Sequence, residues 1–514
     1  MLALATAGLA AAPTTAAETK VDTKVDVPFT KYALPNGLTV ILHEDHSLPL
    51  VTVNMMVKVG SRFEEARRTG FAHLFEHLMF MGTARAPTKM FDAWMEVEGG
   101  WNNAWTSEDR TDYFDVGPAR TLPLLLWLEA DRFSSLGREM TEVKLNVQRD
   151  VVRNERRQTS ENRPYGKADL LIPELLYPEG HPYHHPVIGS HVDLQAASVD
   201  DVKAFFSRFY VPNNASLVVA GDFDAQVVKE RVQALFGGIP AGSPPKAPAA
   251  SEAKLTKVVR ETVTDNVKLP KTIMVWHSPA RFTPGDAELD LAASILQEGK
   301  ASRLYKALVY DRHLAQEVSA SQHQQDLSSV FEIDAVAQPG VTLDQLEAGI
   351  DAEVAKIAAA PVSAEELRRA QNQFETSFVS RLQSVFERAS MLNQYETMKG
   401  DPGYAEKDLA RYRAVTPASL QSVTKSTFDL NARVILRIVP KESAPAAPGT
   451  PAPPAPGTKP VPPAPVTPGT KPAQGAPAVP APAPKPAPPP PAASQTKPAT
   501  PAPAPAPTPK GGAK

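Results

Sequence analysis

Residues 73–77 of this 514-residue chain read HLFEH, which places two imidazoles and a carboxylate on one short segment. A helix turns by about 100° per residue, so His73 and His77 return to nearly the same face. The run from Phe71 to Met81 has no proline or internal glycine, and its apolar residues predict a mostly buried helix. Two histidines and an acid on a buried helix carry a desolvation penalty unless something binds them. The segment therefore predicts a helix built around a metal ion.

The residue types in this segment are those of a zinc hydrolase. Such a site needs two neutral nitrogen ligands and a nearby carboxylate that takes a proton from metal-bound water. His73 and His77 supply the nitrogens, and Glu76 supplies the carboxylate as general base. The alternative interpretation is a core helix with two partly buried histidines and a paired glutamate.

Three segments of the chain resemble a known family. HLFEH, GGWNNAWTSEDRTDY at 99–113 and QRDVVRNERRQ at 148–158 are similar to the pitrilysin/insulinase zinc metallopeptidases. These are inverzincins, whose His-x-x-Glu-His order inverts the commoner His-Glu-x-x-His. The branch that the chain resembles is the bacterial relatives of mitochondrial processing peptidase, over residues 27–440. The resemblance implies a zinc endopeptidase with one Zn2+ per chain, which hydrolyses extended or unfolded peptides through a zinc-activated water with Glu76 as base.

The family takes its third zinc ligand from a glutamate on a later helix, and the matching residue here is Glu155. Its segment is proline-free and opens at Thr141, a good N-cap residue, so a helix is predicted from the residues alone. Gln148 lies two turns earlier on the same face, where the family usually has a second glutamate. A neutral amide can still orient a ligand by hydrogen bonding, although it adds no charge. Taken alone, Glu155 is typical of a solvated helix, and its pairing with HLFEH indicates a ligand.

The segment 99–113 has the composition of a β-strand. In the family, an edge strand at this place pairs with an extended substrate through main-chain hydrogen bonds, a mode that tolerates many sequences. Asn103 and Ala104 match the family's Asn-Ala pair, so the resemblance assigns substrate binding to Asn103, Ala104 and Thr106. The alternative is an ordinary hairpin whose tryptophans lie in a core.

The second half of the chain lacks one part of the family's machinery. The family stabilises the developing oxyanion with an arginine and a tyrosine. The matching stretch, 307–318, has Val309 and Gln316 at these places, and neither supplies the guanidinium or the phenol. We therefore predict a homologous subunit that bears the pair, in a heterodimer; a homodimer would lack both groups. The alternative function is a non-catalytic binding or scaffold subunit of the same fold.

The two halves of the body end in the same way. SVDDVKAFFSRFYVPNNASLVVAGDF and TPASLQSVTKSTFDLNARVILRIVP each indicate a helix, a short break and an apolar strand, with Ser198 and Thr416 as N-cap residues. This similarity predicts a diverged internal duplication. With the resemblance, it implies an α+β fold of two homologous domains, each an antiparallel β-sheet packed by α-helices, which together form half of a clamshell.

Composition divides the chain into five parts. Residues 1–26 are similar to the apolar region and cleavage zone of a secretory signal, with a disordered alanine-rich end as the alternative. The zinc-bearing domain spans 27–239, and a Pro/Ala-rich linker, 240–254, precedes the second domain, 255–440. Residues 441–514 are rich in Pro, Ala and Lys, which predicts a disordered, extended tail. The signal-like start predicts an exported protein, in the periplasm or cell envelope.

Several other functions do not fit the composition. The chain has no cysteine, which excludes disulfides and a cysteine nucleophile. The formal net charge is −3 although the tail is rich in lysine, so the body is acidic and does not suit nucleic-acid binding. No run of about 18 apolar residues occurs, so no transmembrane helix is predicted. HPYHHPVIG at 181–189 holds three histidines, but its prolines indicate a structural loop.

Overall fold

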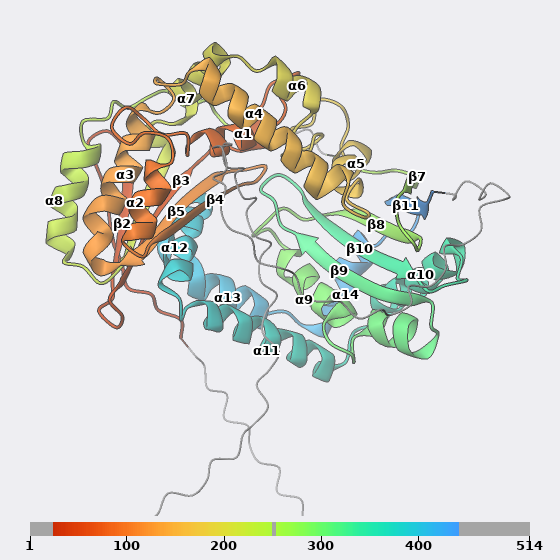
Figure 1. Cartoon of the computed structure of the whole chain (residues 1–514). Coiled ribbons are helices and arrows are strands. Elements are labelled where there is room, and N and C mark those ends of the chain that lie inside the picture. Colours follow the sequence, from red (N-terminus) through yellow and green to blue (C-terminus); the bar gives the residue numbers. More distant parts are fainter. Residues whose placement is uncertain (1–23, 249–252, 442–514) are drawn as a thin grey trace, which may run out of the picture. The chain divides into compact units, whose positions relative to one another are not determined.

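The computed structural model describes residues 24–248 and 253–441. Nearly all of the predicted tail and of the predicted signal segment lies outside the described residues. The described part contains two β-sheets with helices packed on them, as Figure 1 shows, which confirms the predicted fold class. No helix in these two ranges combines the length and the apolar character that a membrane span requires.

The first sheet has six strands in the order β1-β2-β6-β3-β5-β4. Their bounds are Thr30–Ala33 (β1), Thr39–Glu44 (β2), Leu50–Val57 (β3), Trp101–Thr106 (β4), Thr111–Pro118 (β5) and Ala215–Gly221 (β6). β2 and β6 run parallel, and the other neighbours are antiparallel. Within the described residues β4 pairs only with β5, so it forms an edge of the sheet.

The second sheet repeats this topology with five strands in the order β7-β11-β8-β10-β9. Their bounds are Val259–Asp265 (β7), Lys271–Ser278 (β8), Ala315–His323 (β9), Ser329–Ala337 (β10) and Val434–Pro440 (β11). Again one pair, β7 and β11, is parallel. Apart from β1, the two sheets have the same order and the same parallel pair, as expected for the internal duplication.

Helices cover both sheets and enclose a separate apolar core in each half. In the first half they are α1 (Phe71–Leu78), α2 (Met90–Val97), α3 (Leu122–Ser135), α4 (Glu142–Arg156), α5 (Ala168–Leu176), α6 (His191–Ala196), α7 (Val199–Phe209) and α8 (Ala225–Phe236). In the second half they are α9 (Asp286–Gln297), α10 (Leu343–Ala359), α11 (Ala364–Arg381), α12 (Val385–Lys399), α13 (Ala405–Arg413) and α14 (Pro417–Thr427).

Local sequence signals place several of these elements. Ser198 and Thr416 are the N-cap residues of α7 and α14, as predicted, and both form capping boxes. Each helix is followed by an interior strand of its sheet, β6 or β11. The Pro-Asn-Gly turn joins β1 to β2, with the Gly37 N–H donating to the Leu34 carbonyl at 2.9 Å. Gly37 has φ +87°, which favours glycine at this position.

One helix of each half packs on the sheet of the other half, as Figure 1 shows for α12 below the first sheet. The apolar face of α12, with Val385, Ala389 and Leu392, packs on β2 and β6. Ala168 and Leu176 of α5 lie in one apolar cluster with β8 and β11. The proposed boundary at 240–254 therefore divides the chain in sequence, whereas each sheet is completed by a helix from beyond it.

A buried polar contact fixes α12 on the first sheet. Asn393, which is fully buried, donates through Nδ2 to the backbone carbonyl of Asn54 at 3.1 Å and to the Asn54 side chain. Its Oδ1 accepts a hydrogen bond from the hydroxyl of Ser216. Buried polar groups need partners, so this contact selects one position of α12 over others of equal apolar burial.

Candidate active site

The helix α1 carries HLFEH, as predicted, and presents the polar residues of the motif on one face. Phe71, Leu74, Phe75 and Leu78 are buried in the core of the first half. The three polar side chains of the motif lie on the remaining face and are only partly buried. The alternation of apolar and polar positions therefore turns both imidazoles away from the core, toward α4.

An acid outside the motif caps α1. The N-cap residue, Gly70, has no side chain to accept the first N–H groups. The carboxylate of Glu64 caps the helix in its place, accepting hydrogen bonds from the N–H of Gly70 at 2.8 Å and from the N–H of Ala72 at 2.7 Å. Burial raises the pKa of Glu64 to about 8, against the lowering effect of these hydrogen bonds. Sequence inspection did not single out Glu64, because the standard capping positions lie next to the helix start.

The helix α4 brings Glu155 to the two histidines. Thr141 is its N-cap, as predicted, and Glu155 lies in its last turn. Oε2 of Glu155 is 3.1 Å from Nε2 of His77 and 3.9 Å from Nε2 of His73. In the described ranges these three residues form the one group of histidine, cysteine or acidic side chains whose ligand atoms converge, all within 4.8 Å.

The separation of these ligand atoms suits a zinc ion. Zinc bonds to nitrogen and oxygen are about 2.1 Å long, so ligands in a tetrahedron lie about 3.4 Å apart. The carboxylate oxygen lies 3.1 and 3.9 Å from the two imidazole nitrogens, close to that value, and all three atoms lie within 4.8 Å of one another. The donor set of two imidazoles and one carboxylate is the His₂Glu set of known catalytic zinc sites, which leaves a fourth position for water.

The protonation states also favour a metal. Burial lowers the pKa of His73 to about 4, so its imidazole is neutral and can offer a lone pair. Burial also lowers the pKa of His77, but hydrogen bonding and charge from Glu155 raise it by more. The same contact lowers the pKa of Glu155 although burial opposes it. Nε2 of His77 and Oε2 of Glu155 face each other at 3.1 Å, so a cation bound there would contact both side chains.

Glu76 lies between the histidines and the edge strand. Burial raises its pKa, and the hydroxyl of Thr106 donates to its Oε2 at 2.5 Å. Thr106 is the last residue of β4, so the strand expected to bind substrate also contacts the expected base. The sequence resemblance assigned Thr106 to substrate binding and did not indicate its contact with Glu76.

The other predicted site residues lie around this centre. Asn103 is exposed on β4, and its Oδ1 accepts the N–H of Ala104 at 2.9 Å. Gln148 is close enough to His77 to raise the pKa of that imidazole by hydrogen bonding. Its Nε2 also contacts Sδ of Met81 at 2.8 Å. Gln148 thus lies beside His77, one of the residues that could hold a metal.

The expected oxyanion groups are absent from the matching positions. Val309 packs half-buried against the core of the second half, and Gln316 is exposed near the start of β9. The neighbouring Tyr310 is 70% exposed. The structure thus adds nothing at these two positions that could replace a guanidinium or a phenol.

The segment 181–189 forms a structural loop, as predicted. His181 stacks on Tyr177 with ring centroids 4.4 Å apart, and Nδ1 of His184 lies 2.8 Å from the Tyr177 carbonyl. Nδ1 of His185 is 3.6 Å from Oε2 of Glu64, the acid that caps α1. His181 and His184 therefore pack on Tyr177, whereas His185 lies beside the acid that caps the motif helix.

Comparisons with known proteins identify the family of this chain. The family described as Insulinase (Peptidase family M16) matches residues 39–176, and the one described as Peptidase M16 inactive domain matches residues 196–374. The zinc protease PqqE of Helicobacter pylori is 31% identical over 373 residues, 70% of this chain and 82% of that protein. A probable mitochondrial-processing peptidase subunit beta of Arabidopsis thaliana is 24% identical over 67% of this chain and 66% of that protein.

A solved structure shows the same fold. The crystal structure of a protease from Helicobacter pylori matches with a TM-score of 0.76 and 28% identity, over 80% of this chain and 99% of that chain. The resemblance carried by the three motif segments is therefore confirmed. This chain belongs to the insulinase (M16) family of peptidases.

Proposed function

We propose that this chain is the zinc-bearing subunit of an endopeptidase that cleaves extended or unfolded peptides. The observation that carries the proposal is the convergence of His73, His77 and Glu155 beside Glu76. All four lie on α1 and α4, next to the edge strand β4. The name of the Helicobacter pylori relative, a zinc protease, supports the same activity.

His73, His77 and Glu155 would hold one zinc ion per chain, which when bound polarises a peptide carbonyl and acidifies a water molecule. Glu76 accepts the proton of that water and then delivers it to the leaving amine. The Thr106 hydroxyl holds one carboxylate oxygen of Glu76, so the other oxygen is left to exchange the proton. Burial raises the pKa of Glu76 above its ordinary value, which favours proton uptake by this carboxylate.

The substrate would bind as an added strand on β4. This strand has a free edge in the described structure, and its last residue touches the base. An extended peptide paired there passes the metal site at Thr106, and Asn103 and Ala104 would contact it. Recognition through main-chain hydrogen bonds explains a preference for unfolded chains, because folded ones have few free backbone groups.

The proposal includes a homologous partner subunit. Val309 and Gln316 stand where an arginine and a tyrosine are expected, so this chain alone has no such donors at those positions for the developing oxyanion. A subunit that carries them would complete the site. We also propose that the protein is exported to the periplasm or cell envelope, on the basis of the signal-like segment at 1–26.

Peptide hydrolysis by the full chain tests this function, alone and mixed with the homologous subunit, with zinc quantified in both samples. We expect zinc in both and cleavage only in the mixture, and we expect Glu76→Gln to abolish cleavage. Cleavage by the chain alone would refute the need for a partner. Failure to bind zinc would refute the proposal as a whole.

A non-catalytic binding or scaffold subunit is the second candidate. The observation that favours it is the absence of the arginine and tyrosine at Val309 and Gln316. A chain with bound zinc that leaves peptides intact in both samples, yet associates with the homologous subunit, would support this alternative. The intact set of ligands and base favours the peptidase, because a scaffold has no use for it.

A further inference from the structure

A cavity in the second half, away from the metal site, has the features of a ligand pocket. It has a volume of about 240 Å³ and lies among α9, α11, α12 and α13. Its apolar wall consists of Phe282, Phe374, Phe378, Leu382, Met391 and Met398. This volume exceeds the roughly 150 Å³ of an apolar cavity that holds benzene, so a phenyl ring with a short polar chain fits.

One polar group in this wall lacks the partner that its chemistry demands. Arg281 donates to the carbonyl of Gln324 and to Sδ of Met398, and its buried Nε has no hydrogen-bond partner. Within the described part of the chain, no carboxylate forms an ion pair with it. A guanidinium has five donors in a planar fork that matches a carboxylate. Arg281 thus has donors to spare for an anion.

Three of the acids that act on the charge of Arg281 are already paired with other arginines. Three aspartates act on its charge from nearby, and each has a closer partner: Asp286 with Arg411 at 2.7 Å, Asp326 with Arg110 at 2.6 Å and Asp109 with Arg62 at 2.8 Å. Burial lowers the pKa of Arg281, as expected for a cation that lacks a direct counter-charge.

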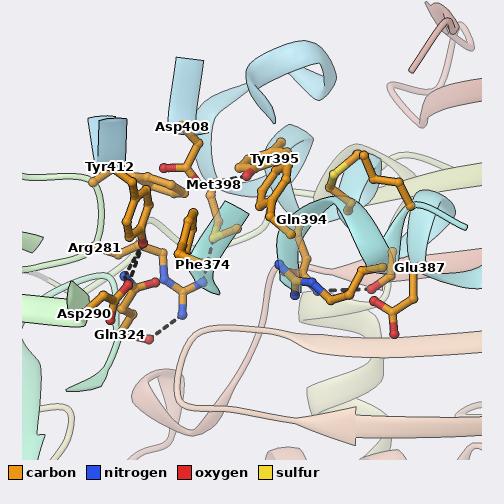
Figure 2. Close-up of a pocket in the computed structure, with 16 residues that line it drawn as sticks. Arg281, Asp290, Gln324, Phe374, Glu387, Gln394, Tyr395, Met398, Asp408 and Tyr412 are labelled. Carbon is orange, nitrogen blue, oxygen red and sulfur yellow. Dashed lines mark hydrogen bonds between the residues drawn. The ribbon is translucent and has the colours of Figure 1, made fainter. Parts of the chain in front are cut away.

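The remaining polar groups leave room for an anion beside Arg281. Figure 2 shows Arg281, Asp290, Gln324 and Tyr412 at one side of the cavity and Glu387 at the other. Asp290 accepts hydrogen bonds from the Tyr412 hydroxyl at 2.5 Å and from Nε2 of Gln324 at 2.7 Å. Burial raises the pKa of Asp290 to about 7, so this carboxyl carries less than a full charge near neutral pH.

We propose that this cavity binds a small carboxylate with an apolar or aromatic body, held by a two-pronged contact between its carboxylate and Arg281. The apolar body packs on the phenylalanines and methionines of the wall. Such a ligand could be a simple carboxylic acid or an α-amino acid, and in the latter the ammonium group would lie beside Asp290. The site is independent of the proposed peptidase activity, because none of its lining residues belongs to the metal centre.

Calorimetric titration of the purified full chain with 3-phenylpropanoate and with 3-phenylpropanamide tests the proposal. The two probes share the same body and differ in charge. We expect saturable 1:1 binding of the carboxylate and about tenfold weaker binding of the amide, since one charge-assisted contact is lost. No binding of the carboxylate at low millimolar concentration, or equal affinity for the two probes, would overturn the proposal.

Two variants test whether Arg281 makes the contact. Arg281→Met should lower the affinity for 3-phenylpropanoate by about tenfold. Arg120→Met, which replaces an exposed arginine of the first half, should leave that affinity unchanged. Unchanged affinity in a folded Arg281→Met would refute the assignment; if this variant does not fold, the probe pair on the wild type still decides. Titration with L-phenylalanine identifies the class of ligand. If L-phenylalanine binds more tightly than 3-phenylpropanoate and Asp290→Asn removes the difference, the ligand is an amino acid. If the two bind equally, the ligand is a simple carboxylic acid.

Discussion

Zinc-dependent stabilisation distinguishes the proposed ligand Glu155 from the proposed base Glu76. A ligand that binds only the folded state stabilises it by RT ln(1 + [L]/Kd), about 2.7 kcal/mol at a free concentration of about 100 times Kd. For a folded body of about 410 residues and an unfolding entropy of about 2 cal/mol/K per residue, this raises Tm by about 3 °C. We expect that rise in the wild type and in Glu76→Gln, and little or none in Glu155→Gln.

The metal-free proteins supply the baseline. Without zinc, Glu155→Gln weakens the contact between Glu155 and His77, whose atoms are 3.1 Å apart. The Glu155 side chain is 34% exposed, and a pair of that exposure contributes at most about 1 kcal/mol. The metal-free Tm should therefore change by about 1 °C or less, which is smaller than the zinc-dependent rise.

The assay is thermal unfolding of chelator-treated protein with and without zinc, together with metal content by mass spectrometry. Glu76→Gln serves as the matched control, because it makes the same amide substitution on the neighbouring helix. A full zinc-dependent rise and full zinc content in Glu155→Gln would remove Glu155 from the ligand set. Loss of the rise in Glu76→Gln would make Glu76 a ligand and refute its role as base.

Three further predictions concern contacts of the fold and site. Thr106→Val should lower kcat about tenfold with KM and zinc content unchanged, because the Glu76 carboxylate loses the hydroxyl that holds it. Thr106→Ser keeps the hydroxyl and should have the wild-type rate. Equal rates in the wild type and both variants would contradict this role. Asn393→Ala should lower the free energy of unfolding, measured by urea titration, by about 2–5 kcal/mol, because it leaves the buried polar partners of Asn393 without a hydrogen bond. A loss well below about 1 kcal/mol would show that the contact is dispensable. Burial raises the pKa of Glu332 to about 7, above its unfolded value near 4.5. The contribution of Glu332 to wild-type stability should therefore be fully present below its unfolded pKa and be lost as the pH rises through its folded pKa. Between pH 4 and pH 8, the free energy of unfolding of Glu332→Gln should rise relative to that of the wild type by up to about 3 kcal/mol. A difference between the two proteins that does not change with pH would refute this.

Local patterns in the sequence were sufficient to predict the helices of the proposed metal site. The helix that carries HLFEH and the one that begins at Thr141 follow from the spacing of apolar residues and from a capping side chain, which act within a few residues. Glu155 required the family resemblance as well, because its own surroundings in sequence are those of a solvated helix. The repeat was also visible, since Ser198 and Thr416 mark the same helix–strand unit twice.

Contacts between distant residues could not be predicted in this way. Thr106 meets Glu76 because β4 passes beside α1, and nothing in either segment indicates the other. The acid that caps α1, Glu64, lies outside the positions at which a cap is sought. The exchange of α5 and α12 between the halves depends on which apolar faces remain open after each core has formed.

By itself, the sequence determined which helices carry HLFEH and Glu155 and that the body repeats one helix–strand unit, because these depend on residue type and on periods of a few residues. The tertiary structure alone decided which side chains meet: His73 and His77 with Glu155, Thr106 with Glu76, and Arg281 with a cavity in place of a counter-ion. These contacts depend on how the sheets and helices pack. Because all residues of the core determine that packing together, no single segment predicts the contacts.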